Sequence, residues 1–415
     1  MTTFKVARAA PGLARVLLLS GLFMMLVQIH RSCGAVIANE LSTHGYTPSQ
    51  IATVVGMLFF ASALCQLPTG ILFDRYGACR TMAGLGGVGV VGIVVFALAD
   101  SVIGLSVGRF LIGLGQGGTI AGIYLLALGW VPADRVATTT GAVVAIAGGI
   151  GGMLATVPLV LLLEAAGHSQ AFLMVAAVTM LVTITLGVFV RDAPQSAESR
   201  AMAASESLAQ SVRGLWAVLS DRKLWPVFAM GSCFSMPFHT VGGLWAGPYL
   251  VDVYAMDAGQ VGFAVLAMVA AFHLGTLLYG PLERAVGSQK RTIVGGVLVM
   301  ITLLVVLAVW PAMGLAPAVV LLVLFCLCTP YFPVLAAHCR SFVPLSRVGR
   351  AIACVNLMGI GTVFIMQKFT GWIVELSASS AGKTSIVGYQ VTFLSVAVLL
   401  ALAVTAYLRV RDAPQ

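Results

Sequence analysis

Charged residues are scarce in this chain of 415 residues. Asp, Glu, Lys and Arg together make up 9% of the sequence, whereas soluble proteins contain roughly 25%. Apolar residues make up 60% of the chain, and its mean hydropathy is +1.02. So few charges cannot cover the surface of a water-soluble fold of this size. The composition therefore predicts an integral membrane protein.

The sequence also lacks the patterns that enzymes need. No Asp or Glu falls in the middle of a long apolar segment, and Glu40 and Glu375 lie near segment ends. Paired carboxylates, H-E-x-x-H, G-x-S-x-G and a phosphate-binding loop are all absent. We therefore expect no enzymatic activity, no cofactor and no resident metal site.

Cysteine is present, but it is placed where disulfides do not form. The eight cysteines lie in apolar segments or in loops that we assign to the cytoplasm. Disulfides belong to oxidising compartments, so a disulfide framework is not expected.

Apolar runs long enough to cross a bilayer, which takes ~20 residues each, recur along the whole chain. Strands of an outer-membrane barrel would instead be ~10 residues long and alternate in polarity. The sequence predicts twelve spans, at residues 13–38, 51–73, 80–99, 103–129, 137–163, 171–190, 225–251, 261–282, 291–311, 317–338, 350–376 and 387–408.

The basic residues indicate the orientation. The net charge is +9, and 19 of the 23 Lys and Arg fall in segments that share one side under the twelve-span count. Cytoplasmic loops carry such an excess, so both termini are predicted to be cytoplasmic in a multi-pass protein of the cell inner membrane. The first span has basic flanks like a signal peptide, but we expect it to be retained. This placement argues against nucleic acid as a partner.

Two internal echoes predict a duplicated chain. Arg-Asp-Ala-Pro-Gln occurs at residues 191–195 and again at 411–415, after the sixth and the twelfth span. A degraded copy of the stretch 70–81 occurs at residues 280–292, at the corresponding place in the second half. Repeats of this kind are common in transporters. We predict an N-terminal bundle at 1–190, a cytoplasmic linker at 191–224 and a C-terminal bundle at 225–415.

The stretch 70–81 compresses charges and glycines into a tight turn between two spans. Gly70, Asp74, Arg75 and Gly77, followed by Arg80, resemble the G-x-x-x-D-R-x-G loop of the major facilitator superfamily, with one basic residue after the second glycine where the family usually has two. The glycines let the chain reverse, and the charges can lock or release a neighbouring helix end.

The resemblance implies an all-α membrane protein of the bacterial type, with twelve transmembrane helices in two six-helix pseudo-repeats. It implies transport by alternating access around a cavity lined by helices 1, 4, 7 and 10. Arg109, followed by Gly113, Gly115 and Gly117, resembles the family's second motif. The residues that the resemblance assigns to gating are Gly70, Asp74, Arg75, Gly77, Arg80, Arg109, Glu283 and Arg284.

Two spans from opposite halves carry cations. Gln28, His30 and Arg31 lie in the first span, and Gln367 and Lys368 in the eleventh. A charge in hydrocarbon costs at least ~2.5 kcal/mol, so it should face a water-filled cavity or a partner. Arg31 could instead pair with Glu40 or reach toward the outer surface.

Arg31 and Lys368 each lie 18 residues from the start of their spans, which is about 27 Å along a helix. The sequence therefore predicts two cations at similar depth with no intramembrane acid to balance them. We expect the counter-charge to be the solute, a small organic anion. The predicted substrate-binding residues are Arg31, Lys368, Gln28, His30, Gln116, Tyr124, His239, Trp245, Tyr331 and Gln367.

Other functions stay open at this stage. Met230, Cys233, Met236 and His239 follow one another at steps of three, and such soft ligands suit Cu(I), so a copper or metal-complex importer is an alternative. A sensor or partner subunit that transports nothing is another. Protons are a candidate coupling ion, with His30, His239 and His273 as the groups that titrate near neutral pH. The expected partners are a small solute and the lipid bilayer, and the expected state is a monomer.

Overall fold

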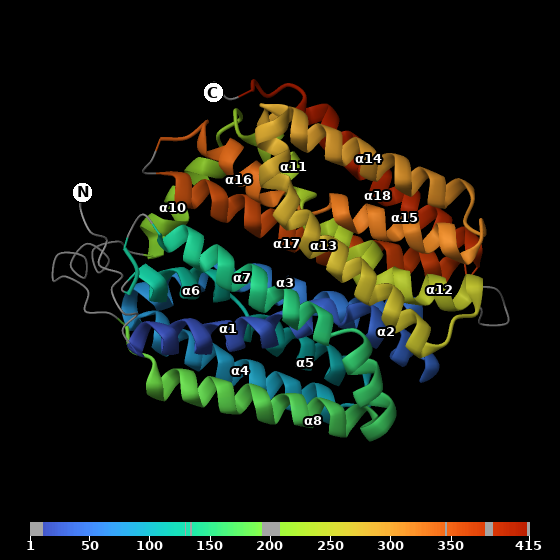
Figure 1. Ribbon diagram of the computed structural model, residues 1–415, viewed down its shortest axis with the longest axis horizontal. Coiled ribbons are helices and arrows are strands. Elements are labelled where there is room, and N and C mark those ends of the chain that lie inside the picture. Colours follow the sequence, from blue (N-terminus) through green and yellow to red (C-terminus); the bar gives the residue numbers. More distant parts are fainter. Residues whose placement is uncertain are drawn as a thin grey trace, which may run out of the picture.

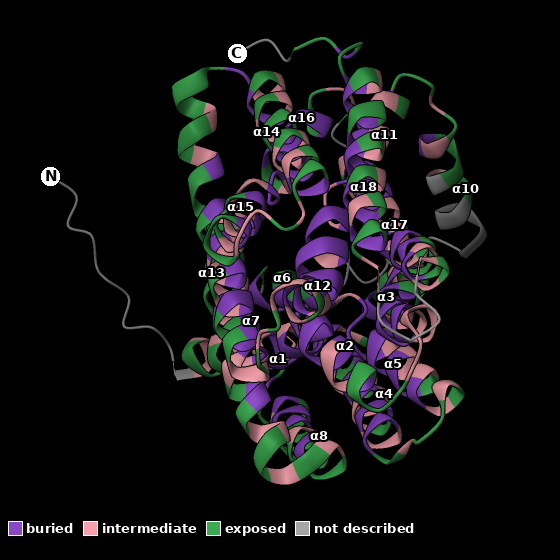
Figure 2. Cartoon of the chain, turned by 90° about the vertical axis from the view of Figure 1, so that its right-hand side faces the viewer, coloured by how far each residue is buried: buried purple, intermediate pink, exposed green. Residues whose placement is uncertain are grey.

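The computed structural model describes residues 11–128, 130–132, 135–192, 208–344, 347–377 and 385–412. Helices of the first half lie together on one side of the molecule and helices of the second half on the other (Figure 1). The predicted all-α membrane fold of two pseudo-repeats is confirmed. Buried residues gather where helices face one another, and exposed residues lie on the outer faces (Figure 2). The exposed residues include large apolar ones such as Ile103 and Phe263.

The first half consists of α1 (Pro11–Ser32), α2 (Gly34–Thr43), α3 (Pro48–Tyr76), α4 (Ala78–Leu98), α5 (Val102–Gly115), α6 (Thr119–Leu128), α7 (Val136–Leu154) and α8 (Val157–Phe189). The second half consists of α11 (Trp225–Ser232), the π-helix η1 (Phe238–Trp245), α12 (Ala246–Tyr254), α13 (Ala258–Val286), α14 (Gln289–Val309), α15 (Leu315–Cys328), α16 (Phe332–Arg340), α17 (Val348–Leu376) and α18 (Ile386–Tyr407). Between the halves, α10 (Leu208–Leu219) lies within the predicted linker.

Among the described residues, ten helices are long and apolar enough to cross a membrane. The two remaining predicted spans correspond to shorter pieces. Residues 138–154 form a shorter apolar helix within α7, and the seventh span is divided into α11, η1 and α12. This division explains why the count of long helices is smaller than twelve while the topology remains consistent with twelve crossings.

The repeated pentapeptide has the same structural task in both halves. Asp192 Oδ1 accepts the backbone N–H of Cys79, at the start of α4, at 2.9 Å. Asp412 Oδ1 accepts the backbone N–H of Lys290, at the start of α14, at 3.4 Å, and its other oxygen accepts the Ser288 hydroxyl. An acid at a helix N-terminus satisfies free N–H groups there. The sequence repeat thus corresponds to the same contact in both halves, an acid that accepts a backbone N–H at a helix start.

The predicted turn at 70–81 is shorter than expected. The helix α3 continues to Tyr76, and the chain reverses at Gly77, whose φ is +84°. Gly287, with φ +66°, takes the same position between α13 and α14. The predicted limits of the two halves stay predictions, and residues 193–207 of the predicted linker lie outside the described residues.

The two halves are packed together at one end of the bundle. We call the end that holds Pro11 and Tyr407 the terminal end and the opposite end the distal end. At the distal end, a Cβ on Gly34 would lie 2.2 Å from Gly243 O, and one on Gly247 would lie 2.9 Å from Ala35 O. Glu375 Oε2 accepts the Ser49 N–H at 3.1 Å across the same boundary. We name these contacts the distal closure.

Helices near the terminal end make their larger contacts within their own half. The helix α6 packs on α1, α4 and α7, and α16 packs on α11, α13, α14 and α17. The tight contact between the halves therefore lies on the distal side of the molecule's middle.

Glycines allow the close helix contacts inside the first half. A Cβ on Gly113 would lie 2.2 Å from Leu58 O, and one on Gly115 would lie 2.5 Å from the Cα atom of Gly89. The helix α5 thus crosses α3 and α4 at backbone contact, and small residues are what membrane helices use for such crossings.

Gly113→Ala is expected to destabilise the protein, because its methyl group would press on a backbone oxygen that cannot move aside. Overpacking of this kind costs about 1–3 kcal/mol. The measurement is the apparent melting temperature of the detergent-purified protein. Gly84→Ala is the matched control, because nothing lies within 4 Å of the added Cβ. Equal melting temperatures for the two variants would contradict the packing argument.

Candidate functional site

Several spans are interrupted, and helices 1, 4, 7 and 10 are among them. The first is interrupted at Cys33, between α1 and α2, and the fourth at residues 116–118, between α5 and α6. The seventh passes through a non-helical stretch and the π-helix η1, and the tenth is interrupted at residues 329–331. Inside a bilayer such interruptions persist only where the freed backbone is buried in protein or lines a cavity. Discontinuous helices are also where transporters bind their solutes.

Arg31 lies in the last turn of α1, beside the first interruption. Its Nε atom is buried and has no hydrogen-bond partner among the described residues, and none of them forms an ion pair with it. The C-terminal end of a helix carries partial negative charge, which favours a cation there by about 0.3–1 kcal/mol. That contribution is smaller than the cost of at least ~2.5 kcal/mol for a charge in hydrocarbon.

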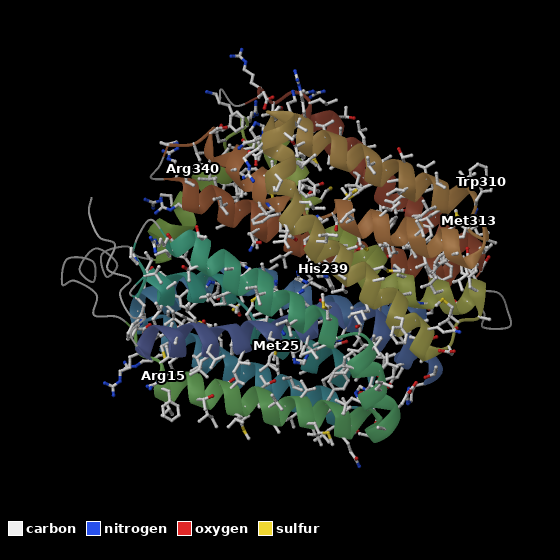
Figure 3. All side chains as sticks on the ribbon, viewed as in Figure 1. Arg15, Met25, His239, Trp310, Met313 and Arg340 are labelled. Atoms are coloured by element: carbon white, nitrogen blue, oxygen red, sulfur yellow. The ribbon has the colours of Figure 1, made fainter. Side chains whose placement is uncertain are left out.

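The second half places His239 close to Arg31, and Gln367 is bonded to the His239 backbone. Arg31 is close enough to His239 for the two groups to interact electrostatically. Gln367 Nε2 donates to the His239 carbonyl oxygen at 2.8 Å, while His239 Nδ1 and Gln367 Oε1 are buried without partners. His239 lies near the middle of the molecule, where the halves meet (Figure 3). Gln367 Oε1 faces Gly56 of α3, where an added Cβ would lie 3.2 Å from it. His239 is thus the polar group of the second half that the electrostatics relate to Arg31.

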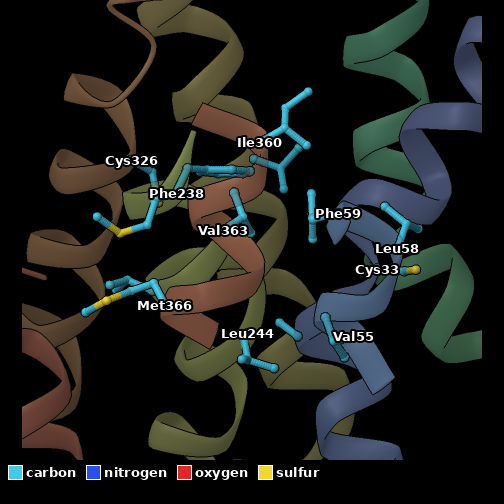
Figure 4. Packing of buried hydrophobic residues seen from close by; sticks show 14 of the residues in the cluster. Cys33, Val55, Leu58, Phe59, Phe238, Leu244, Cys326, Ile360, Val363 and Met366 are labelled. Carbon is cyan, nitrogen blue, oxygen red and sulfur yellow. The ribbon is translucent and has the colours of Figure 1, made fainter. Parts of the chain in front are cut away.

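Apolar side chains surround this polar group. The Phe59 ring lies 4.5 Å from the His239 ring. Side chains of α3 and α17, including Phe59 and Val363, lie between the halves together with Phe238 of η1 (Figure 4). A dry environment of this kind strengthens every electrostatic interaction made inside it.

Three further polar groups border the interface. Gln28, one turn before Arg31 on α1, donates to Ser32 Oγ at 3.0 Å. Ser32 Oγ and His273 Nε2 both face Gly152 of α7, where an added Cβ would lie 3.5 Å and 3.1 Å from them. His273 Nε2 is buried without a partner. We name Arg31, His239, Gln367, Gln28, Ser32 and His273 the central cluster.

Sequence reasoning found most of this cluster but not all. It treated His273 only as a titratable group and did not single out Ser32. Serine is common in membrane helices, so its presence alone carries no signal. The glycines at 149 and 152 were the indirect signal, because they mark where another helix approaches α7.

The structural alternative for Arg31, a pair with Glu40, is wrong. Glu40 Oε1 instead contacts Nδ1 of His168 at 2.9 Å. Glu40 lies on α2, beyond the interruption at Cys33, and its side chain turns toward α4 and α8 of its own half.

The structure does not bring Lys368 into the central cluster. Its Nζ donates to Thr53 Oγ1 at 2.6 Å and to Ser49 Oγ at 3.3 Å, and the side chain is exposed. It shares its helix face with Ile365 and Trp372, which are 66% and 55% exposed. Successive residues of a helix point about 100° apart, so Gln367 faces the interior while Lys368 faces outward. The prediction that two cations share the site thus finds no support in this geometry.

His30 and Gln116 face the interior of the first half. They line a cavity of about 20 Å³, and both ring nitrogens of His30 and Oε1 of Gln116 are buried without partners. A cavity of this size holds about one water molecule. Tyr124, on α6, is 42% exposed. None of the three makes a described contact with the central cluster, and their role in binding stays a prediction.

Trp245 and Tyr331 are buried and satisfied. Trp245 Nε1 donates to Thr370 Oγ1 at 2.8 Å, and the Tyr331 hydroxyl donates to Met230 O at 3.1 Å. These bonds tie the interrupted helices 7 and 10 to their neighbours. A binding role for either side chain stays a prediction.

Arg109 supports the interruption of helix 1. Its Nη1 donates to His30 O at 3.1 Å, its Nη2 contacts Cys33 Sγ at 3.5 Å, and its guanidinium lies 4.8 Å from the centre of the Phe96 ring. Arg109 is 1% exposed. It satisfies a carbonyl next to the break and so holds the backbone that carries Arg31.

The other predicted gating residues lie at the terminal end. Gly70, Asp74, Arg75 and Arg80 are exposed around the turn at Gly77. In the second half, Glu283 accepts from Gln289 Nε2 at 2.8 Å and Arg284 is exposed. Their gating role stays a prediction.

The soft ligands of helix 7 do not share one helix face. Met230 belongs to α11, Cys233 follows its end, and His239 lies in η1 beyond the interruption. His239 also lies beside the Arg31 cation, which would repel a metal ion. In the described part of the chain, no group of three or more His, Cys, Asp or Glu forms a metal site. All eight cysteines are free thiols.

Comparison with known proteins adds the family. Residues 16–359 match the family model described as Major Facilitator Superfamily. A curated relative, the probable sulfoacetate transporter SauU of Cupriavidus necator, is 25% identical over 258 residues. That match covers 60% of this chain and 59% of the relative, so the chain spans less than two thirds of the length of this relative.

Solved structures share the fold across almost the whole chain. A mutant of the nucleoside transporter NupG matches with a TM-score of 0.77 at 13% identity, covering 95% of this chain and 98% of that one. A bacterial homologue of the human lysosomal transporter Spinster, in an inward-facing and unoccupied conformation, matches with a TM-score of 0.72 at 17% identity, covering 98% and 99%. Since the family model covers most of the chain and the fold agrees with it, the protein belongs to the Major Facilitator Superfamily of membrane transporters.

Proposed function

We propose that the solute of this transporter is a small organic anion and that Arg31 binds it. The observation that supports the proposal is the partly buried Arg31, whose Nε atom is buried and has no acidic partner among the described residues, and which lies close to His239 of the second half. A carboxylate or sulfonate would supply the missing negative charge. Charge-assisted hydrogen bonds from arginine to such groups are strong and directional.

The central cluster contains further hydrogen-bonding groups besides the Arg31 guanidinium. Gln367 and His239 reach the site from the second half, and Gln28 and Ser32 from the first. A solute held by both halves can draw them together, which is what coupling of binding to rocking requires. The likeness to a probable sulfoacetate transporter supports an anion as cargo, and sulfoacetate is the probe of choice.

Transport by alternating access then follows from the placement of the contacts. The distal closure blocks the central cluster on one side, and it must separate when the halves rock. With both termini in the cytoplasm of a bacterial cell, as the basic residues predict, the distal end faces outward. The state seen here is then closed to the outside. We take the functional unit to be a monomer in the inner membrane.

Arg31→Gln is expected to weaken sulfoacetate binding by roughly 100-fold or more, because a buried charged pair loses one partner. Arg31→Lys should retain part of the affinity, since it keeps the charge but loses the planar fork. The measurement is isothermal titration calorimetry of the purified protein with sulfoacetate, with size-exclusion profiles as the check on folding.

Lys368→Gln provides the matched control for this experiment. It also removes one cation from a span, but from an exposed position outside the central cluster. We expect its affinity for sulfoacetate to stay within a few-fold of the original. An equal loss of affinity in both variants would restore the two-cation prediction, and no loss in Arg31→Gln would contradict the proposed site.

Gly34→Ala is expected to open the distal closure, because the added methyl would lie 2.2 Å from the Gly243 carbonyl oxygen. A clash of this kind shifts the equilibrium between closed and open states by roughly tenfold or more. Spin labels at Tyr46 and Leu376 report the distance across the distal end. We expect a longer distance in Gly34→Ala than in the Gly87→Ala control, whose Cβ meets nothing within 4 Å. Equal distances would contradict the role given to this contact.

A further inference from the structure

A second buried polar site lies within the first half, about Glu40 and His168. Glu40 belongs to α2, and His168 follows the kink of α8 at Gly167, whose φ is +74°. Their side chains are 13% and 18% exposed. Glu40 Oε1 lies 2.9 Å from His168 Nδ1, and His168 Nε2 lies 3.1 Å from the Phe96 carbonyl oxygen at the end of α4. The imidazole thus joins three helices.

The two contacts of the imidazole fix how many protons the pair holds. A carbonyl oxygen only accepts, so His168 Nε2 must carry a proton to bond to Phe96 O. The contact between Nδ1 and Oε1 then needs a second proton, carried either by the ring or by the carboxyl group. A neutral ring with an ionised carboxylate would set two lone pairs against each other at one of the contacts. The observed geometry is therefore that of the pair with one proton more than a neutral ring and an ionised carboxylate hold together.

Loss of that proton would break one of the two bonds. If Nε2–H is kept, Glu40 loses its partner on α8; if the ring changes tautomer, the bond to α4 is lost. Glu40 Oε2 is buried and without a partner among the described residues, so the ionised carboxylate has no other donor at hand. Release of the proton thus loosens α2 from α4 and α8.

The helix α2 is also the part of the first half that completes the distal closure. Gly34 and Ala35, at its start, pack against Gly243 and Gly247 of the second half. Arg109 joins the two regions, since its guanidinium lies over the Phe96 ring and donates to His30 O beside Arg31. The position of α2 therefore links the pair to the central cluster and to the contact that shuts it.

Water reaches the pair from the distal end. A cavity of about 370 Å³ is lined there by His168, His44, Tyr46, Asp100, Ser169 and Gln170, among others. The groups that face the pair from the neighbouring elements are Arg109 on α5, Asp100 after α4, and His44 and Tyr46 after α2. Of these, His44 Nδ1 contacts Glu40 O, and the Tyr46 hydroxyl donates to Asp100 O. None of these four groups takes the place of Glu40 or His168 in the two bonds.

We propose that the Glu40–His168 pair is a proton-dependent latch on the closed state. The proton enters from the distal cavity and bridges Oε1 and Nδ1, its binding holds α2 in the closed position, and its return to the distal side favours opening. This inference rests on the proposed anion transport, because the latch would make the rate of anion transport depend on the pH at the distal side.

Glu40→Gln tests the proposal, because the amide can donate to Nδ1 permanently and so imitates the proton-bound pair. In proteoliposomes, we expect the exchange of labelled sulfoacetate by the original protein to become severalfold faster as the pH on the distal side is raised. We expect exchange by Glu40→Gln to stay at the low-pH rate throughout. His44→Gln, which alters a group in the same cavity outside the pair, is the control and should keep the pH dependence. A pH dependence of exchange retained by Glu40→Gln would overturn the proposal.

A second measurement needs no solute and separates this inference from the proposed function. The proton-bound pair stabilises the closed packing, so the melting temperature of the purified protein should fall as pH rises through the titration of the pair. Glu40→Gln should flatten this dependence, and His44→Gln should not. If sulfoacetate is not transported but the pH dependence is lost in Glu40→Gln, the anion proposal fails and the proton site stands. An unchanged pH profile in Glu40→Gln would overturn the proton site itself.

Discussion

The proposed solute site depends on the Arg31 guanidinium, which lies in a membrane-spanning helix and has no acidic partner among the described residues. Arg31 lies at the end of α1, where the helix dipole offers partial compensation and no more. Arg109 also lacks an acidic partner, and its Nε atom, like that of Arg31, has no hydrogen-bond partner among the described residues. The two arginines differ in their other contacts, since Arg109 donates to the His30 carbonyl and contacts the Cys33 thiol and the Phe96 ring. Arg109 thus holds the backbone beside the break, and we propose that Arg31 binds the solute.

The rest of the first half keeps this site in place. Helix 1 can be interrupted at Cys33 because Arg109 reaches the freed carbonyl and because glycines let α5 approach α3 and α4 closely. The second half also contains an interrupted helix, helix 7. Its π-helix places the His239 carbonyl oxygen where Gln367 donates to it. Each half also contains an equivalent acid that accepts a backbone N–H at an equivalent helix start. These acids are Asp192 in the first half and Asp412 in the second. The two halves thus share equivalent helix-end contacts, while the proposed site uses different residues from each half.

Much of this was readable from the sequence, and the failures have physical causes. Hydropathy located the spans, and the repeated pentapeptide indicated the duplication. Arg31 stood out because charge is costly in a membrane. Lys368 stood out for the same reason, but hydropathy does not tell which way a helix is turned, and one residue separates the interior face from the exposed one. The similar depth predicted for Arg31 and Lys368 therefore did not show which way each side chain points.

Partners that are far apart in the chain were beyond sequence reasoning. Glu40 and His168 are 128 residues apart. The sequence around either residue gives no signal that the other is its partner. His30 and Gln116 were predicted for the substrate site because they lie on helices 1 and 4, yet they meet in a small cavity inside one half. Local periodicity assigns residues to helices, while the choice of neighbour across helices follows from packing.

A structure determined with sulfoacetate bound tests the central claim most directly. The account predicts an anionic group of the ligand within hydrogen-bond distance of the Arg31 guanidinium, between the halves, with His239 and Gln367 around it. A ligand bound away from Arg31, or an Arg31 that turns to an acidic side chain when the ligand is present, would contradict the account.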